Sequence, residues 1–279
     1  MILNDSSEII QFSFQNIVNE LEGYIGEDFE PEIRDYVKIN GEYYYAKMVT
    51  SREMLNELIG SYYSNLIGLD AVQYKIGIFD GKLYALSKMF FKKDIGYVYC
   101  AEYFSPSLFF STTNREIIKR KEFFFESGNL KRLNSDEAVK SILQMSAVDI
   151  KMSQADRHSF NIIIRIVNGV AYIEKVFDFG WAYDIYPDEN NAVYYKNPFV
   201  IVKKDYISIS MLADKHPEFG RCAAILSNAP VGDVLRDIES SFNIKVTDED
   251  FKYYVDKDKE YTKILRKALW KNQIYYVID

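Results

Sequence analysis

The stretch from Asp156 to Gly180, DRHSFNIIIRIVNGVAYIEKVFDFG, decides the fold of this chain. The Asn168-Gly169 pair in its middle supplies the two positive-φ residues of a tight type I′ turn, and β-branched runs flank it on both sides. A two-residue turn at this point pairs Val167 with Val170. The sequence therefore predicts a β-hairpin.

Three polar side chains lie around this hairpin. Continued pairing places Asn161 opposite Val176, so Asp178 points to the same face as Asn161. Such diagonal neighbours lie roughly 7–8 Å apart, close enough for an amide oxygen and a carboxylate to share a cation. Asp156 stands where the chain enters the hairpin.

These residue types suit phosphoryl transfer from ATP. Mg²⁺ is a hard ion that binds oxygen ligands and takes few carboxylates from the protein, and a further carboxylate must orient the attacking hydroxyl. Asn161 and Asp178 fit the metal role, and Asp156 fits the role of the base. The plainer interpretation is a charged turn and an ordinary hairpin that ends in a solvated aspartate.

Asp156-Arg157-His158-x-x-Asn161, a hairpin and then Asp178-Phe179-Gly180 resembles the catalytic core of the phosphatidylinositol-kinase-like branch. Within that branch it is similar to the HipA-like serine/threonine protein kinases, including small bacterial kinases of the CtkA type. Ordinary protein kinases usually carry His-Arg-Asp where this chain has Asp-Arg-His. The resemblance implies phosphorylation of protein serine or threonine, commonly including the kinase itself. It also implies that His158 is structural or supports the catalytic aspartate. We interpret Arg157 as an ion-pair partner rather than a catalyst.

A lysine and a glutamate upstream complete the predicted site. Lys47 lies in the second strand of a hairpin that turns at Asn40-Gly41, and the capping box from Thr50 to Glu53 opens a helix that should end at Gly68. Glu57 lies at the edge of the buried face of this helix. The pair resembles the kinase lysine and glutamate, in which the glutamate holds the lysine against the nucleotide phosphates.

A further hairpin turns at Asp80-Gly81 and leads to Met89, Phe90 and Phe91, where a kinase hinge would meet the adenine edge. No glycine-rich phosphate loop precedes the lysine strand. After residue 208 the pattern predicts five helices: Ser208 to Lys215, Arg221 to Ser227, Val231 to Phe242, Asp248 to Val255 and Lys259 to Lys271.

Composition, charge and cysteine content argue against several other classes of protein. The 279 residues are 48% hydrophobic, which predicts a globular chain, and the net charge of −7 argues against nucleic acid as a partner. Cys100 and Cys222 have no motif that would predict a disulfide or a zinc site. The sequence has no apolar run of membrane-spanning length and no signal peptide, so we expect a cytoplasmic protein. Export by a dedicated secretion system would leave no mark on it.

We therefore expect an α+β, two-lobed protein kinase-like fold. A β-rich small lobe spans residues 1–91, and a mainly helical large lobe spans residues 92–279. ATP, Mg²⁺ and a protein substrate, which can be the chain itself, are the expected ligands. Two alternatives remain at this stage: a lipid or small-molecule kinase of the same fold, and a non-catalytic nucleotide-binding scaffold, which the absent phosphate loop favours.

Overall fold

The computed structural model describes residues 1–3, 9–15, 17–21, 35–93, 95–100, 103, 133–154, 157, 161–183 and 206–271. Its elements are, in chain order, β1 (Ile2–Leu3), β2 (Ile9–Gln11), α1 (Val18–Leu21), β3 (Tyr36–Ile39), β4 (Glu42–Met48), α2 (Ser51–Ile67), β5 (Tyr74–Phe79), β6 (Lys82–Lys88), β7 (Gly96–Tyr99), α7 (Asp136–Met152), β8 (Ile163–Val167), β9 (Val170–Ile173), α8 (Tyr206–Lys215), α9 (Pro217–Ser227), α10 (Val231–Phe242), β10 (Ile244–Lys245) and α11 (Asp248–Lys271).

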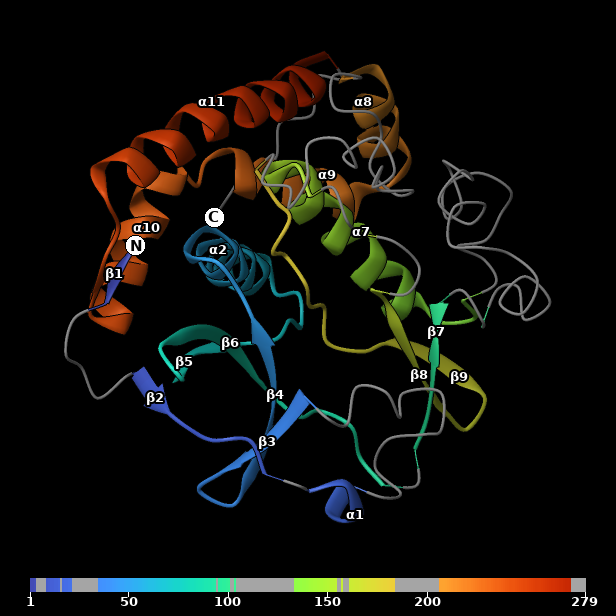
Figure 1. The fold of residues 1–279 in the computed structure, drawn as a ribbon. Helices are drawn as coiled ribbons and strands as arrows, with labels where there is room; N and C mark the ends of the chain where they lie inside the picture. Colours follow the sequence, from blue (N-terminus) through green and yellow to red (C-terminus); the bar gives the residue numbers. More distant parts are fainter. Residues whose placement is uncertain are drawn as a thin grey trace, which may run out of the picture.

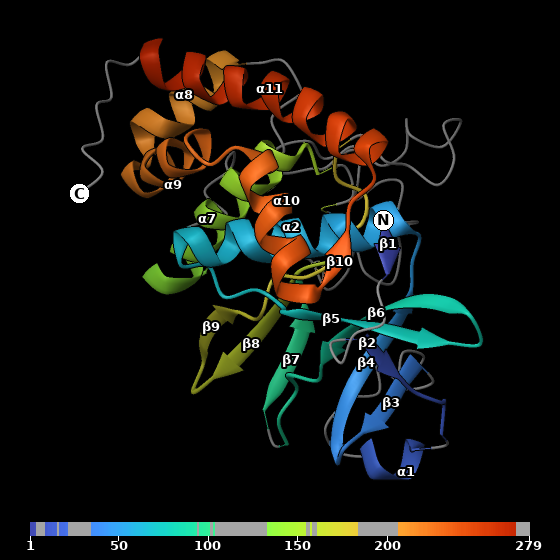
Figure 2. The ribbon, with the colours of Figure 1, turned by 90° about the vertical axis from the view of Figure 1, so that its left-hand side faces the viewer.

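The strands β2 to β6 gather at one end of the molecule and the helices α8, α9 and α11 at the other, with α2 between them (Figure 1). A view from the side shows the same division and places α10 next to α2 (Figure 2). This arrangement confirms the expected α+β, two-lobed fold. The division at residue 91 stays a prediction.

The larger sheet has the strand order β2-β5-β6-β4-β3. Its two hairpins turn where the sequence predicted, since Asn40 and Gly41 have φ angles of 51° and 83°, and Asp80 and Gly81 have 49° and 70°. β4 lies between β3 and β6, so the sheet fixes Lys47 opposite Ala85. The lysine strand is therefore held on both edges.

Helix α2 forms as its end signals predicted. The side chain of Thr50 accepts a hydrogen bond from the Glu53 N–H, and the Glu53 carboxylate accepts one from the Thr50 N–H. Gly68 ends the helix at a φ of 76°, in the left-handed region that glycine adopts without strain. Most of the helix between these caps is buried, which places Glu57 inside the protein.

The second hairpin confirms part of the predicted register. β8 and β9 pair Val167 with Val170 across Asn168-Gly169, and β7 pairs with the other edge of β8. The regular pairing ends near Ile163, so the prediction that Asn161 lies opposite Val176 is wrong. Val176 instead exchanges backbone hydrogen bonds with the link between α2 and β5, where it forms a parallel bridge to Ala71.

The C-terminal helices differ from prediction in two places. α9 begins at Pro217 rather than Arg221, because proline is tolerated at a first helical position, where no N–H is needed. The two predicted helices from Asp248 are one continuous helix, α11. No proline or glycine interrupts it, and Asp258 at the expected break lies inside the protein, where it pairs with Lys151 at 2.7 Å.

Two contacts tie the N-terminal residues and α2 to the C-terminal helices. β1 pairs with β10, and Arg52 near the start of α2 forms a 2.8 Å ion pair with Asp250 of α11. Burial alone would raise the pKa of the Asp250 carboxyl, but hydrogen bonds from Arg52, the terminal ammonium of Met1 and Thr247 lower it to about 2.

In the described part of the chain, no helix has the length and apolar character needed to span a membrane.

Asp250 should contribute to acid sensitivity. Its folded pKa lies below the ordinary value of 3.8, so its stabilising effect is complete above that value and is lost as the pH falls through about 2. We expect the unfolding free energy of wild type to fall more steeply between these pH values than that of Asp250→Asn. Denaturant titrations measure this slope. Asp256→Asn, which alters an exposed ion pair on the same helix, should keep the wild-type slope.

Candidate active site

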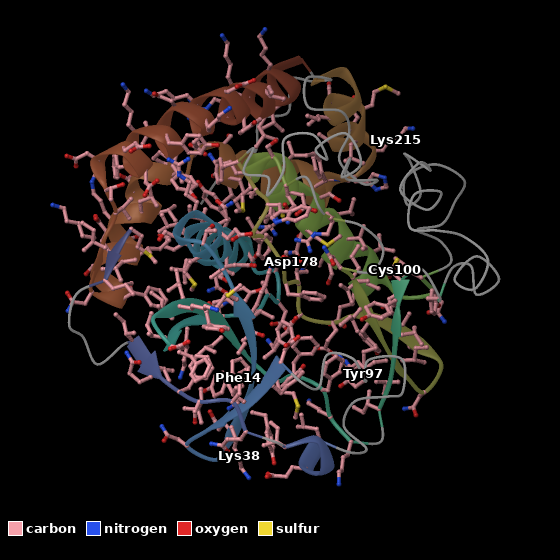
Figure 3. The ribbon with its side chains drawn as sticks, viewed as in Figure 1. Phe14, Lys38, Tyr97, Cys100, Asp178 and Lys215 are labelled. Carbon is pink, nitrogen blue, oxygen red and sulfur yellow. The ribbon has the colours of Figure 1, made fainter. Side chains whose placement is uncertain are left out.

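Three charged side chains from separate elements meet at one point. The ammonium of Lys47 lies 3.2 Å from Glu57 Oε1 and 2.5 Å from Asp178 Oδ1. Lys47 comes from β4, Glu57 from α2, and Asp178 follows β9 by a few residues. Asp178 lies near the centre of the molecule, between the ribbons of α2 and α7 (Figure 3). The structure therefore brings together three of the predicted site residues.

The three side chains differ in exposure. Glu57 is fully buried, whereas the side chains of Lys47 and Asp178 are 29% and 25% exposed. Burial raises the pKa of Glu57, while Lys47 and the Phe179 N–H act against this rise. Burial would lower the pKa of Lys47, but Asp178 and Glu57 together raise it well above its ordinary value. The lysine thus stays a cation, and the open side of the cluster presents an ammonium and a carboxylate.

The backbone that carries Asp178 is tightly bound. Asp178 has a φ of 61°, a left-handed conformation that aspartate tolerates better than most residues. Its N–H donates to the Tyr74 hydroxyl at 3.0 Å, and its carbonyl accepts from Gln154 Nε2 at 2.5 Å. Burial raises the pKa of Tyr74 well above its ordinary value, so this hydroxyl remains protonated. These contacts aim the Asp178 side chain at Lys47.

Phe179 attaches the same segment to α2. Its N–H donates to Glu57 Oε2 at 2.7 Å, so one carboxylate holds both the lysine and this segment. Its ring lies against Gly60, where an added Cβ would come within 2.2 Å of the ring. A glycine at this position is therefore required for the close approach of the ring to the helix.

Arg157 binds the backbone of one predicted metal ligand, Asn161, and of the residue before the other, Phe177. Its buried guanidinium pairs with the buried Asp149 at 3.2 Å, which confirms the expected ion-pair role. Nη1 donates to the carbonyl of Asn161 at 3.3 Å and to the carbonyl of Phe177 at 2.5 Å. One arginine therefore binds the backbone of Asn161 and that of Phe177, the residue before Asp178. The oxygens of an amide and a carboxylate are ligand types that suit Mg²⁺.

The predicted hinge residues form an apolar wall that leads to Asp178. The ring of Phe90 lies 4.7 Å from that of Phe91 and 6.3 Å from that of Phe177, the residue before Asp178. The Met89 N–H donates to the Tyr43 carbonyl and extends the pairing of the sheet. The structure thus places an apolar cluster of rings next to Phe177, the residue before Asp178.

Two predicted residues, Asp156 and His158, lie outside the described residues. Sequence reasoning did not identify Tyr74, Gln154 or Asn56, whose side chains bind the segment around Asp178. Tyr74 and Asn56 lie more than a hundred residues from Asp178, on β5 and α2, and Gln154 lies just after the end of α7. Only the folded contacts reveal their role.

No protein-family model and no curated protein sequence matches this chain. Solved structures, however, do match it. The proinflammatory kinase CtkA of Helicobacter pylori superimposes with a TM-score of 0.60 at 12% identity, over 86% of this chain and 94% of that one. The fold is that of a HipA-like kinase.

A second solved structure agrees with the first. HipA from the toxin–antitoxin system of Shewanella oneidensis, in complex with HipB and operator DNA, superimposes with a TM-score of 0.57 at 12% identity. The match covers 87% of this chain but 65% of HipA, so this chain spans less than two thirds of that protein. At such identity the likeness establishes the HipA-like fold and leaves the chemistry to the residues of the site.

The contact between Gly60 and Phe179 predicts that alanine at position 60 destabilises the protein more than alanine at a control glycine does. Gly60→Ala should destabilise the protein by about 1–3 kcal/mol, because the ring of Phe179 must move away from α2. Gly232→Ala in α10 is the matched control, since its Cβ would meet Phe251 at an ordinary 3.4 Å. Helix propensity should leave that variant as stable as wild type or more so. Chemical denaturation measures both; equal effects would contradict the close contact.

Proposed function

We propose that this chain transfers the γ-phosphoryl group of ATP to serine or threonine hydroxyls of proteins, including its own. The observation that carries the proposal is the cluster of Lys47, Glu57 and Asp178. A buried glutamate that fixes a strand lysine beside a partly exposed aspartate is an arrangement suited to binding phosphate and metal together. The HipA-like fold supports the same chemistry.

Each residue has a distinct task in this proposal. Lys47 binds phosphate oxygens, and Glu57 holds it in place while itself shielded from solvent. Asp178 and Asn161 hold Mg²⁺, which supplies positive charge to the phosphates when bound. Such fixed charges stabilise the transition state because they need no rearrangement during the reaction.

Asp156 is the proposed base. It orients the acceptor hydroxyl and takes its proton as the hydroxyl oxygen bonds to the γ-phosphorus, while the bond from that phosphorus to the β-phosphate oxygen breaks and ADP leaves. His158 supports Asp156 by the same resemblance. Phe90 and Phe91, whose rings pack towards Phe177, are the proposed adenine wall. Met89 would offer adenine its carbonyl, since its N–H already donates to Tyr43.

We favour a protein acceptor over a lipid. The chain from Trp181 to Pro198 follows the site in sequence and contains acidic and tyrosine residues rather than a basic or apolar patch for a membrane. A non-catalytic nucleotide-binding scaffold is the other class, and loss of transfer on mutation of Asp178 would argue against it. A bacterial effector or toxin role, with action in a cytoplasm, is proposed by analogy with the two solved structures.

The test is incubation of the purified protein with radiolabelled ATP and Mg²⁺. Wild type should become labelled, whereas Lys47→Met and Asp178→Ala should lose transfer by about 10²-fold or more, because each removes a fixed charge from the site. Phosphosite mapping on serine or threonine would identify the acceptor.

Matched controls come from other lysine ion pairs. Lys88→Met alters a strand lysine that pairs with Glu42, and Asp70→Ala alters an aspartate that pairs with Lys175. Both should keep wild-type transfer. Full labelling of Asp178→Ala, or a wild type that neither binds ATP nor becomes labelled, would contradict the proposal.

A further inference from the structure

The segment from Asp178 to Tyr183 is bound along its backbone by residues from distant parts of the chain. Tyr74, Gln154 and Glu57 bind its first two residues, as described above. At the other end, the Tyr183 N–H donates to the Met152 carbonyl at 2.7 Å, and the Tyr183 carbonyl accepts from the Tyr253 hydroxyl at 2.6 Å. In the middle of the segment, one buried side chain binds two backbone carbonyls.

That side chain is Asn56, the neighbour of Glu57 on α2. It is fully buried, and its Nδ2 donates to the carbonyl of Gly180 at 2.7 Å and to the carbonyl of Ala182 at 2.9 Å. Both amide hydrogens are therefore used on the segment that follows Asp178. α2 thus binds this segment twice, through Glu57 and through Asn56.

Tyr254 of α11 determines the orientation of Asn56. Its hydroxyl lies 3.0 Å from Asn56 Oδ1 and 3.0 Å from the Arg52 carbonyl, and it shares its single hydrogen between them. Tyr254 is fully buried, and its ring packs edge-on against that of Tyr183 at 5.3 Å. The same tyrosine therefore supports both Asn56 and the end of the segment.

The conformation of Tyr183 indicates that these contacts hold the segment against strain. Its φ is 53°, in the left-handed region that a bulky side chain rarely adopts. Such a conformation persists where the surroundings fix it. Here Met152, Tyr253 and Tyr254 surround the residue.

We propose that Asn56 is a positioning residue for Asp178, oriented from α11 by Tyr254. Asn56 touches no substrate; it keeps the segment from Gly180 to Ala182 against α2 and thereby keeps Asp178 in the site. The inference rests on the proposed function, since it assigns Asp178 to Mg²⁺. It adds that a helix near the C-terminal end of the chain controls the metal ligand.

Loss of the Asn56 side chain should weaken the binding of Mg²⁺ more than the binding of ATP. Without its two hydrogen bonds the part of the segment from Gly180 to Ala182 is held less firmly against α2, so Asp178 is in place for a smaller fraction of the time, and only that fraction can bind the ion. Apparent affinity falls in proportion to that fraction, so a tenth of the population in place means about tenfold weaker Mg²⁺ binding. Lys47 and Glu57 remain paired, so the Michaelis constant for ATP at saturating Mg²⁺ should change little.

The experiment is a Mg²⁺ titration of phosphoryl transfer at saturating ATP, with the thermal midpoint measured for each variant. Asn56→Ala should raise the half-saturating Mg²⁺ concentration about tenfold or more, because two buried carbonyls lose their donor. Tyr254→Phe keeps the packed ring and removes one hydroxyl, so about a threefold rise is expected. This gentler variant keeps the test open if Asn56→Ala does not fold.

Tyr62→Phe is the matched control. Its hydroxyl also joins α2 to a C-terminal helix, through Asp237 of α10 at 2.7 Å, but it has no hydrogen bond to the segment that follows Asp178. It should keep the wild-type Mg²⁺ dependence, whatever it does to the thermal midpoint.

The outcomes separate the two claims. If wild type transfers phosphate and both variants lower the thermal midpoint without a change in Mg²⁺ dependence, Asn56 is structural only and the inference is overturned. If wild type itself transfers no phosphate, the proposed function fails and the inference fails with it. A shift in Mg²⁺ dependence in both variants, absent from Tyr62→Phe, supports the inference.

Discussion

The rest of the site depends on the carboxylate of Glu57. It is fully buried, and a buried charge is stable only where it is paired and hydrogen-bonded. One oxygen pairs with Lys47 and the other accepts from the Phe179 N–H. These two bonds join β4, α2 and the segment after β9, so the sheet and the hairpin must come together around this helix.

Helix α2 can perform this role because contacts at several of its turns hold it in place. Gly60 allows the ring of Phe179 to approach closely. One and two turns earlier, Asn56 and Arg52 bind α11 through Tyr254 and Asp250. The helix that carries the central glutamate therefore cannot shift without disturbing the C-terminal helices. This explains how contacts far from the charged cluster can act on its geometry.

Local signals in the sequence predicted much of this arrangement. The Asn-Gly and Asp-Gly turns, the capping box before α2 and the Gly68 stop all lie where the sequence placed them, because each depends on a few neighbouring residues. The Lys47–Glu57 pair followed from the motif order. The bridge between Val176 and Ala71 could not be predicted from local signals. The register of a hairpin fixes only the pairing of its own two strands, and Ala71 lies outside that hairpin. The role of Asn56 could not be predicted either, because its partners lie more than a hundred residues away in the sequence.

The central claim is that Lys47, Glu57 and Asp178 form a site for a nucleotide phosphate and a divalent cation. Calorimetric titration of wild type with ATP, with and without Mg²⁺, tests it most directly. We expect ATP to bind and Mg²⁺ to tighten this binding, because the ion that Asp178 is proposed to hold would add positive charge beside the phosphates. ATP binding that is indifferent to Mg²⁺, or no ATP binding at all, would contradict it.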